Sequence, residues 1–171
     1  EDDSEIATAT ITVTPINDAP ISTDVNSSGS EANIITTTLT ATDVDNSDTN
    51  DFEFIILSEP NYIDGNVTVD SYTYTSGTFT ATATYTHDGS EHPSDPTSTD
   101  TYTDTFTFKA NDGATDSPGD LESDEHTATI TITPVNDAPE TPDVSGSGNE
   151  GQTITTTLTA TDVDNDCDNN P

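Results

Sequence analysis

Positive charge is almost absent from this sequence: its 171 residues include one Lys or Arg against 34 Asp and Glu, a formal net charge of -33. Nucleic acids and anionic membrane surfaces are bound through basic patches, so neither is expected as a partner. No apolar run approaches the roughly 18 residues of a membrane span, and the opening EDDSEIATAT is not a secretory signal. The charge favours cations as partners.

Covalent and hydrophobic means of stabilisation are also scarce. The single cysteine, Cys167, cannot form an internal disulfide. Leu, Ile, Val and Phe amount to about 17% of the chain, below the roughly 20% at which a strongly charged sequence is expected to be disordered. Folding therefore depends on where the few apolar residues lie, and bound metal is the remaining means of neutralising the charge.

A repeat of about 119 residues organises the chain. PINDAP at 15–20 returns as PVNDAP at 134–139, and 30 of 52 positions are identical between 1–52 and 120–171. This predicts the last strand of a preceding domain over 1–14, a complete domain with its N-terminal linker over 15–133, and a linker with the first strands of the next domain over 134–171. We expect the chain to be a section of a longer tandem array.

Alternation with a period of two predicts β-strands, and no segment has a helical period. The segment 78–86 places Phe79, Ala81, Ala83 and Tyr85 on one face and threonine on the other. About seven strands in the unit predict an all-β fold, an immunoglobulin-like seven-stranded Greek-key β-sandwich. The other strands are predicted shortly after Pro20 and over 35–42, 52–57, 67–75, 102–110 and 127–133, with a long loop over 87–100.

Acidic residues recur beside the predicted strand ends. In such a sandwich the loops after the second and sixth strands lie at one end, so their carboxylates should meet the entry linker. A second group should face the exit linker and the next unit at the opposite end. The first group is Asn17, Asp18, Asp43, Asp45 and Asp112, and the second is Glu31, Asp104, Asn136, Asp137, Asp162 and Asp164.

These groups predict metal sites. Two carboxylates about 4 Å apart repel by roughly 4 kcal/mol at an effective dielectric of 20, so such clusters need cations. Oxygen ligands without Cys or His select calcium over zinc. A single DxD is commonly ordinary turn chemistry, and it is the recurrence of Glu, DxD, AxDG and NDxP in one order that predicts calcium at both linkers.

The motifs resemble cadherin-like tandem repeats of large bacterial and archaeal surface proteins and adhesins. SEANIITTTLTATDVDN at 30–46 is similar to that family's glutamate, strand and AxDxD run, and TDTFTFKANDG at 103–113 to its strand ending in AxDG; TATITITPVNDAP at 127–139 is similar to its last strand and NDxP linker. The resemblance implies calcium between successive domains and an extracellular or cell-surface location. The family's acidic DxE before the sixth strand has no clear match, and we expect Asp104, or Asp100, to substitute.

Together these features predict a non-enzymatic, calcium-rigidified rod of tandem domains that projects a binding region or forms a cell-surface fibre. Its partners would be neighbouring repeats or identical chains. His87, His92 and His126 are far apart in sequence, and no Cys or Ser is placed as a nucleophile, which argues against catalysis. Two alternatives stay open: a surface- or carbohydrate-recognition module with its own cell-surface or glycan ligand, and a spacer of a larger secreted enzyme.

Overall fold

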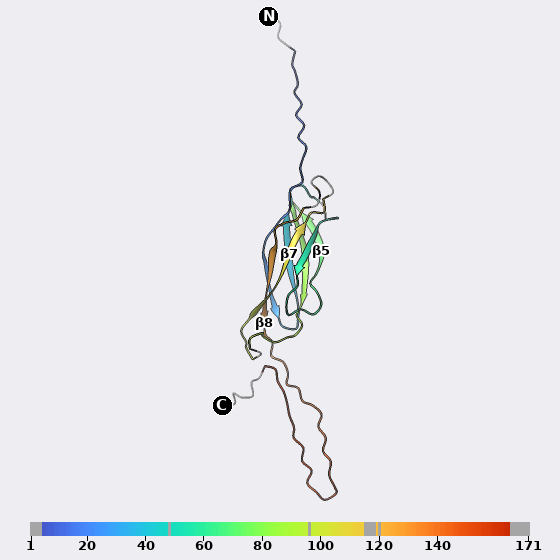
Figure 1. Cartoon of the computed structure of the whole chain (residues 1–171), viewed down its shortest axis with the longest axis vertical. Coiled ribbons are helices and arrows are strands. Elements are labelled where there is room, and N and C mark those ends of the chain that lie inside the picture. Colours follow the sequence, from blue (N-terminus) through green and yellow to red (C-terminus); the bar gives the residue numbers. More distant parts are fainter. Residues whose placement is uncertain (1–4, 48, 96, 115–118, 120, 165–171) are drawn as a thin grey trace.

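The computed structural model describes residues 5–47, 49–95, 97–114, 119 and 121–164, and Cys167 lies outside these ranges. The described residues form β-strands and no helix, so none of them belongs to a helix that could cross a membrane. The body is slender, and the two terminal segments leave it at opposite ends (Figure 1). The strands are β1 (Ile21–Ser22), β2 (Val25–Ser30), β3 (Ile34–Thr42), β4 (Glu53–Ser58), β5 (Thr68–Thr75), β6 (Thr78–Thr86), β7 (Tyr102–Asn111) and β8 (His126–Thr133).

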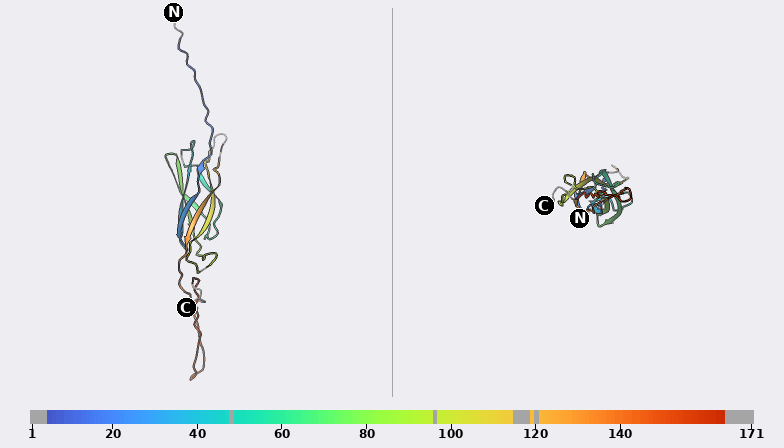
Figure 2. Two further views of the ribbon diagram at one scale, coloured as in Figure 1. Left: turned by 90° about the vertical axis from the view of Figure 1, so that its left-hand side faces the viewer. Right: turned by 90° about the horizontal axis from the view of Figure 1, so that it is seen from below.

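The strands of the described part lie in two four-stranded sheets, with the orders β1-β3-β6-β5 and β2-β8-β7-β4. Neighbouring strands pair antiparallel, except that β2 runs parallel to β8. Both sheets run along the length of the body (Figure 2), and their inner faces share one buried core. The predicted all-β fold is therefore confirmed as an arrangement of two packed sheets.

The predicted alternation of buried and exposed faces is also confirmed. Phe79, Ala81, Ala83 and Tyr85 of β6 are all buried, and β3, β7 and β8 likewise bury every second residue. The apolar residues are thus concentrated on the inner faces, where each large side chain contributes about 1.5–3 kcal/mol on burial. This concentration explains how a chain with 27% hydrophobic residues forms a core.

The first strand differs from the prediction, because it is divided between the two sheets. β1 pairs with β3, and after Thr23 and Asp24 the chain crosses to the other sheet, where β2 pairs with β8. The Asp24 carboxylate accepts a hydrogen bond from the backbone N–H of Thr127 at 2.9 Å, which fixes the crossing at the start of β8. The described residues therefore form eight strands where about seven were expected.

Loops gather at the two ends of the body. The β3–β4 and β7–β8 loops lie at the end where the chain enters from residues 5–20, as predicted, and the β2–β3, β4–β5 and β6–β7 loops lie at the exit (Figure 1). The long loop expected over 87–100 is the β6–β7 connection. Residues 5–20 are extended without an assigned strand, so the strand expected before residue 15 stays a prediction.

Candidate metal sites

The entry linker meets both loops at its end of the sandwich in a group that we call the proximal cluster: Asn17, Asp18, Asp43, Asp45 and Asp112. The side-chain amide of Asn17 donates to Asp112 Oδ2 at 2.7 Å, and the backbone N–H of Asp18 donates to Asp45 Oδ2 at 2.8 Å. Asn46 connects these pairs, because its backbone N–H donates to Asp43 Oδ1 and its side-chain amide donates to the carbonyl of Asp112. The N–H of Asp45 also donates to Asp43, so all five predicted residues of this end belong to one hydrogen-bonded group.

Two carboxylates of the proximal cluster are buried. Asp112 is 1% exposed, and its Oδ1 accepts the backbone N–H groups of Ala114 and Leu121 at 3.0 and 2.9 Å. Asp43 is 7% exposed, and its Oδ1 accepts the N–H of Asp45 at 2.8 Å. Its Oδ2 is buried without a hydrogen-bond partner in the described part of the chain. Such an atom loses its hydration without compensation, which costs free energy unless a ligand supplies it.

The opposite end holds a second group, the distal cluster: Glu31, Glu91, Asp137, Asp162 and Asp164. Glu31 is 3% exposed, and its Oε2 accepts the backbone N–H of Val135 in the exit linker at 3.1 Å. Asp164 accepts the backbone N–H of Asp137, and its own N–H donates to Asp162 Oδ1 at 3.1 Å. Among the described residues, Glu31 Oε1 has no hydrogen-bond partner although it is buried.

The geometry around the two linkers recurs at the spacing of the sequence repeat. The bond from Asp18 N to Asp45 has its counterpart 119 positions later in the bond from Asp137 N to Asp164. The turn within each DxD recurs in the same way. The pairing of Ile21 with Thr42 also has a counterpart, the bridge between Glu140 and Thr161. Each linker thus contacts the DxD loop that follows it.

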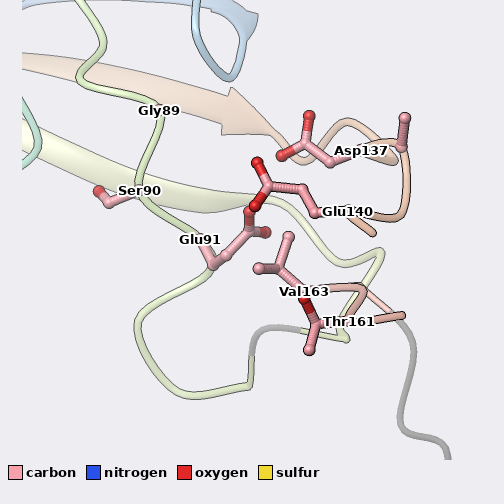
Figure 3. Close-up of a pocket in the computed structure, with 8 residues that line it drawn as sticks. Gly89, Ser90, Glu91, Asp137, Glu140, Thr161 and Val163 are labelled. Carbon is pink, nitrogen blue, oxygen red and sulfur yellow. The ribbon is translucent and has the colours of Figure 1, made fainter. Parts of the chain in front are cut away.

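Glu91 belongs to the distal cluster although the sequence analysis did not select it. It lies in the β6–β7 loop and lines a cavity of about 420 Å³ with Asp137, Glu140 and Val163. Figure 3 shows the side chains of Glu91, Asp137 and Glu140 turned toward this cavity. The Oε2 atom of Glu91 is buried and has no hydrogen-bond partner within the described ranges. The available signal was the segment HDGSEH at 87–92, whose acidic residues are three apart rather than two.

Electrostatics explain why Glu91 is unusual. Burial, followed by the charges of Glu31, Asp164 and Asp137, raises the pKa of Glu91 to about 7 from its ordinary value of 4.5. The repulsion is the expected consequence of several carboxylates around one cavity. A cation at this position would reverse the effect, because it favours the ionised form.

Asp104 does not join the distal cluster in the way that was expected. It is 2% exposed, and its carboxylate accepts the backbone N–H groups of Asn61 and Tyr62 at 2.9 and 2.7 Å. The hydroxyl of Tyr85 also donates to it at 3.2 Å, and burial followed by the charge of Asp104 raises the pKa of Tyr85, so that hydroxyl stays protonated. Asp104 of β7 is therefore a structural acceptor that holds the β4–β5 loop.

The remaining predicted residues of this end are exposed. The amide of Asn136 donates to the carbonyl of Asp137 at 2.9 Å, whereas its counterpart Asn17 reaches a carboxylate. Asp100 is exposed, and its N–H donates to Ser98 at 3.1 Å. Neither contact brings a further carboxylate oxygen to the distal cavity.

The donor chemistry of both clusters fits a hard cation. The buried side-chain N and O atoms that lack a partner in the described residues are all carboxylate oxygens, and all lie in these clusters: Asp43 Oδ2, Glu31 Oε1 and Glu91 Oε2. The described residues contain no group of three or more His, Cys, Asp or Glu side chains already arranged around a common metal position. An ion would therefore depend on amide and backbone oxygens as well, which calcium accepts.

Comparison of the chain with family models, with curated proteins and with solved structures finds no match.

Proposed function

We propose that this chain is part of an extracellular rod of tandem cadherin-like β-sandwiches, in which calcium at each linker holds successive domains in a fixed orientation. One observation carries the proposal. The buried polar side-chain atoms left without a partner in the described structure are carboxylate oxygens, and they lie at the two linkers. Buried charged groups are normally paired or bound to metal.

The linkers supply the mechanical connection. Glu31 belongs to the sandwich, Asp137 to the exit linker and Asp164 to the DxD loop that follows, so one cluster draws on three successive parts of the chain. Each pair of carboxylates about 4 Å apart repels by roughly 4 kcal/mol at an effective dielectric of 20. Calcium would convert this repulsion into a shared coordination shell and restrict the linker. Without the ion the same charges would push the parts away from one another.

The strand order supports the cadherin-like part of the proposal. The sheet orders β1-β3-β6-β5 and β2-β8-β7-β4 are compatible with the Greek-key sandwich that we propose, if its first strand is divided between the two sheets. Tandem β-sandwiches with short linkers suit an extended surface structure, and the sequence resemblance gives the same expectation. The proposed role is mechanical, in projecting a binding region or assembling a fibre.

Calcium titration of the whole chain tests the proposal. We expect saturable calcium binding to the metal-free protein at two classes of site. The affinity of the proximal cluster should fall about tenfold or more in Asp43→Asn, and that of the distal cluster should fall by a similar factor in Glu31→Gln. Asp143→Asn is the matched control, because Asp143 is exposed and belongs to neither cluster. Absence of saturable binding to the wild type, or an equal loss in the control, would contradict the proposal.

A second candidate function, surface recognition, is favoured by the outer face of the first sheet. Neighbouring strands there pair threonine with threonine, and every position of the grid except Asp70 is threonine. Strand geometry spaces these side chains about 4.8 Å apart across the sheet and about 6.8 Å along it. The four rows are Thr68-Thr84-Thr36, Asp70-Thr82-Thr38, Thr73-Thr80-Thr40 and Thr75-Thr78-Thr42.

A co-sedimentation assay with insoluble polysaccharide tests this second candidate. Thr82→Lys interrupts the grid at its centre and should abolish retention if the face recognises a carbohydrate surface. Thr105→Lys places the same charge on the other sheet, where Thr105 pairs with Thr129, and should leave retention unchanged. Failure of the wild-type chain to sediment with the polysaccharide would exclude recognition of that surface as a function of the threonine face.

A further inference from the structure

The imidazole of His87 lies between the two loops that carry Glu31 and Glu91, the glutamates of the distal cluster that each have a buried oxygen without a partner in the described residues. His87 is 3% exposed, and its Nδ1 accepts the backbone N–H of Ala32 at 3.3 Å and that of Gly89 at 3.0 Å. Ala32 directly follows Glu31, and Gly89 lies two residues before Glu91. One ring nitrogen therefore ties together the backbone beside both carboxylates.

The other ring nitrogen extends the connection. Because Nδ1 accepts two hydrogen bonds, the proton of the neutral ring lies on Nε2, which donates to the hydroxyl of Tyr102 at 2.8 Å. That hydroxyl donates in turn to the carbonyl of Ser90 at 3.2 Å. Burial, followed by the charge of Glu31, raises the pKa of Tyr102, so the hydroxyl keeps the proton that it donates. The residue before Glu91 is thus held as well.

The backbone beside Glu31 needs such support. Ala32 has a φ of 54° and Gly89 a φ of 81°, both in the left-handed region. This region is uncommon for a residue with a side chain, whereas glycine enters it freely. Ala32 therefore depends on surrounding contacts, of which the bond from its N–H to His87 is one. Loss of the imidazole would release the turn that carries Glu31.

We propose that His87 is a positioning residue for the distal cation site, where it sets the separation of the Glu31 and Glu91 carboxylates. The inference rests on the proposed calcium function and adds a residue outside the ligand set. Groups that orient ligands through hydrogen bonds typically change metal affinity by about 10–100-fold when they are removed. The proximal cluster does not include His87, so it provides an internal reference in the same chain.

Calcium affinity in two backgrounds tests the proposal. In Asp43→Asn, which weakens the proximal cluster, His87→Leu should reduce the remaining affinity by about 10–100-fold. In Glu31→Gln, which weakens the distal cluster, the same substitution should change the remaining affinity less than about twofold. His87→Asn should recover most of the distal affinity, because its Oδ1 can occupy the place of Nδ1. Equal losses in both backgrounds would overturn the proposal.

A second pair of variants keeps the test decisive if His87→Leu does not fold. Tyr102→Phe removes the hydroxyl that links His87 to Ser90 and should weaken only the distal site. Tyr85→Phe is the matched control, because the buried hydroxyl of Tyr85 bonds Tyr62 in the β4–β5 loop and Asp104 in β7, and neither residue carries a distal-cluster carboxylate. It should lower stability without changing distal affinity. An unchanged distal affinity in Tyr102→Phe would overturn the proposal.

Amide hydrogen exchange separates this inference from the calcium proposal. In the metal-free protein, the amides of Ala32 and Gly89 should exchange at least tenfold faster in His87→Leu than in the wild type, and His87→Asn should restore their protection. If the wild type binds no calcium but this pattern holds, the metal function fails and the loop-positioning role stands. If calcium binds and both amides keep their protection in His87→Leu, the positioning role fails.

Discussion

Buried carboxylates in this protein fall into two kinds that differ in how their oxygens are satisfied. Asp104 accepts hydrogen bonds at both oxygens from backbone groups and from Tyr85. Asp43 and Glu31 each use one oxygen for the backbone and leave the other buried without a partner in the described structure. By this measure Asp43 and Glu31 are the candidate metal ligands and Asp104 is a structural acceptor. Asp112 is also satisfied at both oxygens, and it supports the proximal cluster by holding its loop against the entry linker.

Substitution of Asp104 by Asn should therefore lower stability without affecting calcium. The amide retains one acceptor oxygen and turns an NH₂ group toward N–H donors, so we expect a loss of about 2–4 kcal/mol in the free energy of unfolding. Urea denaturation measures the loss, and calorimetric titration of the folded variant should give the wild-type calcium affinity. A variant of wild-type stability with weakened calcium binding would show that Asp104 is a ligand after all.

The raised pKa of Glu91 makes a prediction about pH. A carboxyl whose folded-state pKa is about 7 still holds its proton where the unfolded chain, titrating near 4.5, has lost it. The folded state binds more protons in that window, so this group makes stability fall as pH rises from about 4.5 through 7. Without calcium, Glu91→Gln should thus be more stable than the wild type at pH 8, with a smaller difference at pH 5.

In calcium, the wild type should be more stable than Glu91→Gln, the reverse of their order without the ion. The reason is that the ion binds the ionised carboxylate and the amide is a weaker ligand. Thermal unfolding in chelator and in calcium, each at pH 5 and pH 8, measures the difference in stability between Glu91→Gln and the wild type under the four conditions. Glu125→Gln serves as the charge-matched control, since Glu125 is exposed and lies outside both clusters. If Glu91→Gln and the control respond alike, the pKa of Glu91 is not controlled by the cluster.

At the scale of elements, alternation predicted the strands because each inner face is read from neighbouring residues. The division between β1 and β2 could not be predicted in this way, since it depends on Asp24 bonding to Thr127, which is distant in sequence. The position of Glu91 could not be predicted from periodicity, because a long loop has none, and the spacing of its acidic residues was only a weak signal. Asp104 was a different case: it shares the inward phase of Tyr102 and Phe106, which already indicated a buried acceptor.

The loop after β7 gives a prediction that separates the two clusters. Gly113 has a φ of 60°, and an added Cβ would lie 2.2 Å from the carbonyl oxygen of Asp51. Gly113→Ala should therefore displace the loop that holds Asp112, lower stability, and weaken calcium binding at the proximal cluster alone. Calorimetric titration in the Glu31→Gln background, where the proximal site is the stronger one, measures the effect.

Gly77→Ala is the matched control for this loop. Gly77 also has a positive φ, 86°, but an added Cβ would meet no atom within 4 Å. The substitution Gly77→Ala should lower the free energy of unfolding only by the cost of holding a residue with a side chain in the left-handed region, about 1–2 kcal/mol. It should leave calcium affinity unchanged. Equal effects of the two substitutions on calcium would mean that the Asp112 loop does not contribute to the site.

At the scale of the whole molecule, charge is distributed unevenly along the body. Apart from Ile34, the outward positions of β3 and β6 are threonines, whereas carboxylates gather at the loops and linkers of both ends. Electrostatic repulsion is therefore concentrated where successive domains would meet. Simple salt screens such repulsion, with a Debye length of about 3 Å at 1 M, but it does not connect particular oxygens. A coordinated ion does both.

Calcium should therefore stiffen the chain as well as stabilise it. Each site saturated at 100 times its dissociation constant adds about 2.7 kcal/mol to stability. Small-angle scattering of the whole chain should show a better-defined maximum dimension in calcium than in chelator, because the linker over 134–140 would no longer flex. A protease of broad specificity should cleave that linker more slowly in calcium.

Three comparisons decide whether the ion acts at the linker. Chelator with 1 M NaCl should not reproduce the calcium profile, because screening alone leaves the linker free. Glu31→Gln should remove the calcium response of the exit linker, whereas Asp43→Asn, with the same loss of one charge at the other end, should retain it. Magnesium should act more weakly, because it demands near-octahedral geometry and gives up water reluctantly. An identical scattering profile in calcium and chelator would mean that the carboxylates are surface charges and that the linkers are not metal-rigidified.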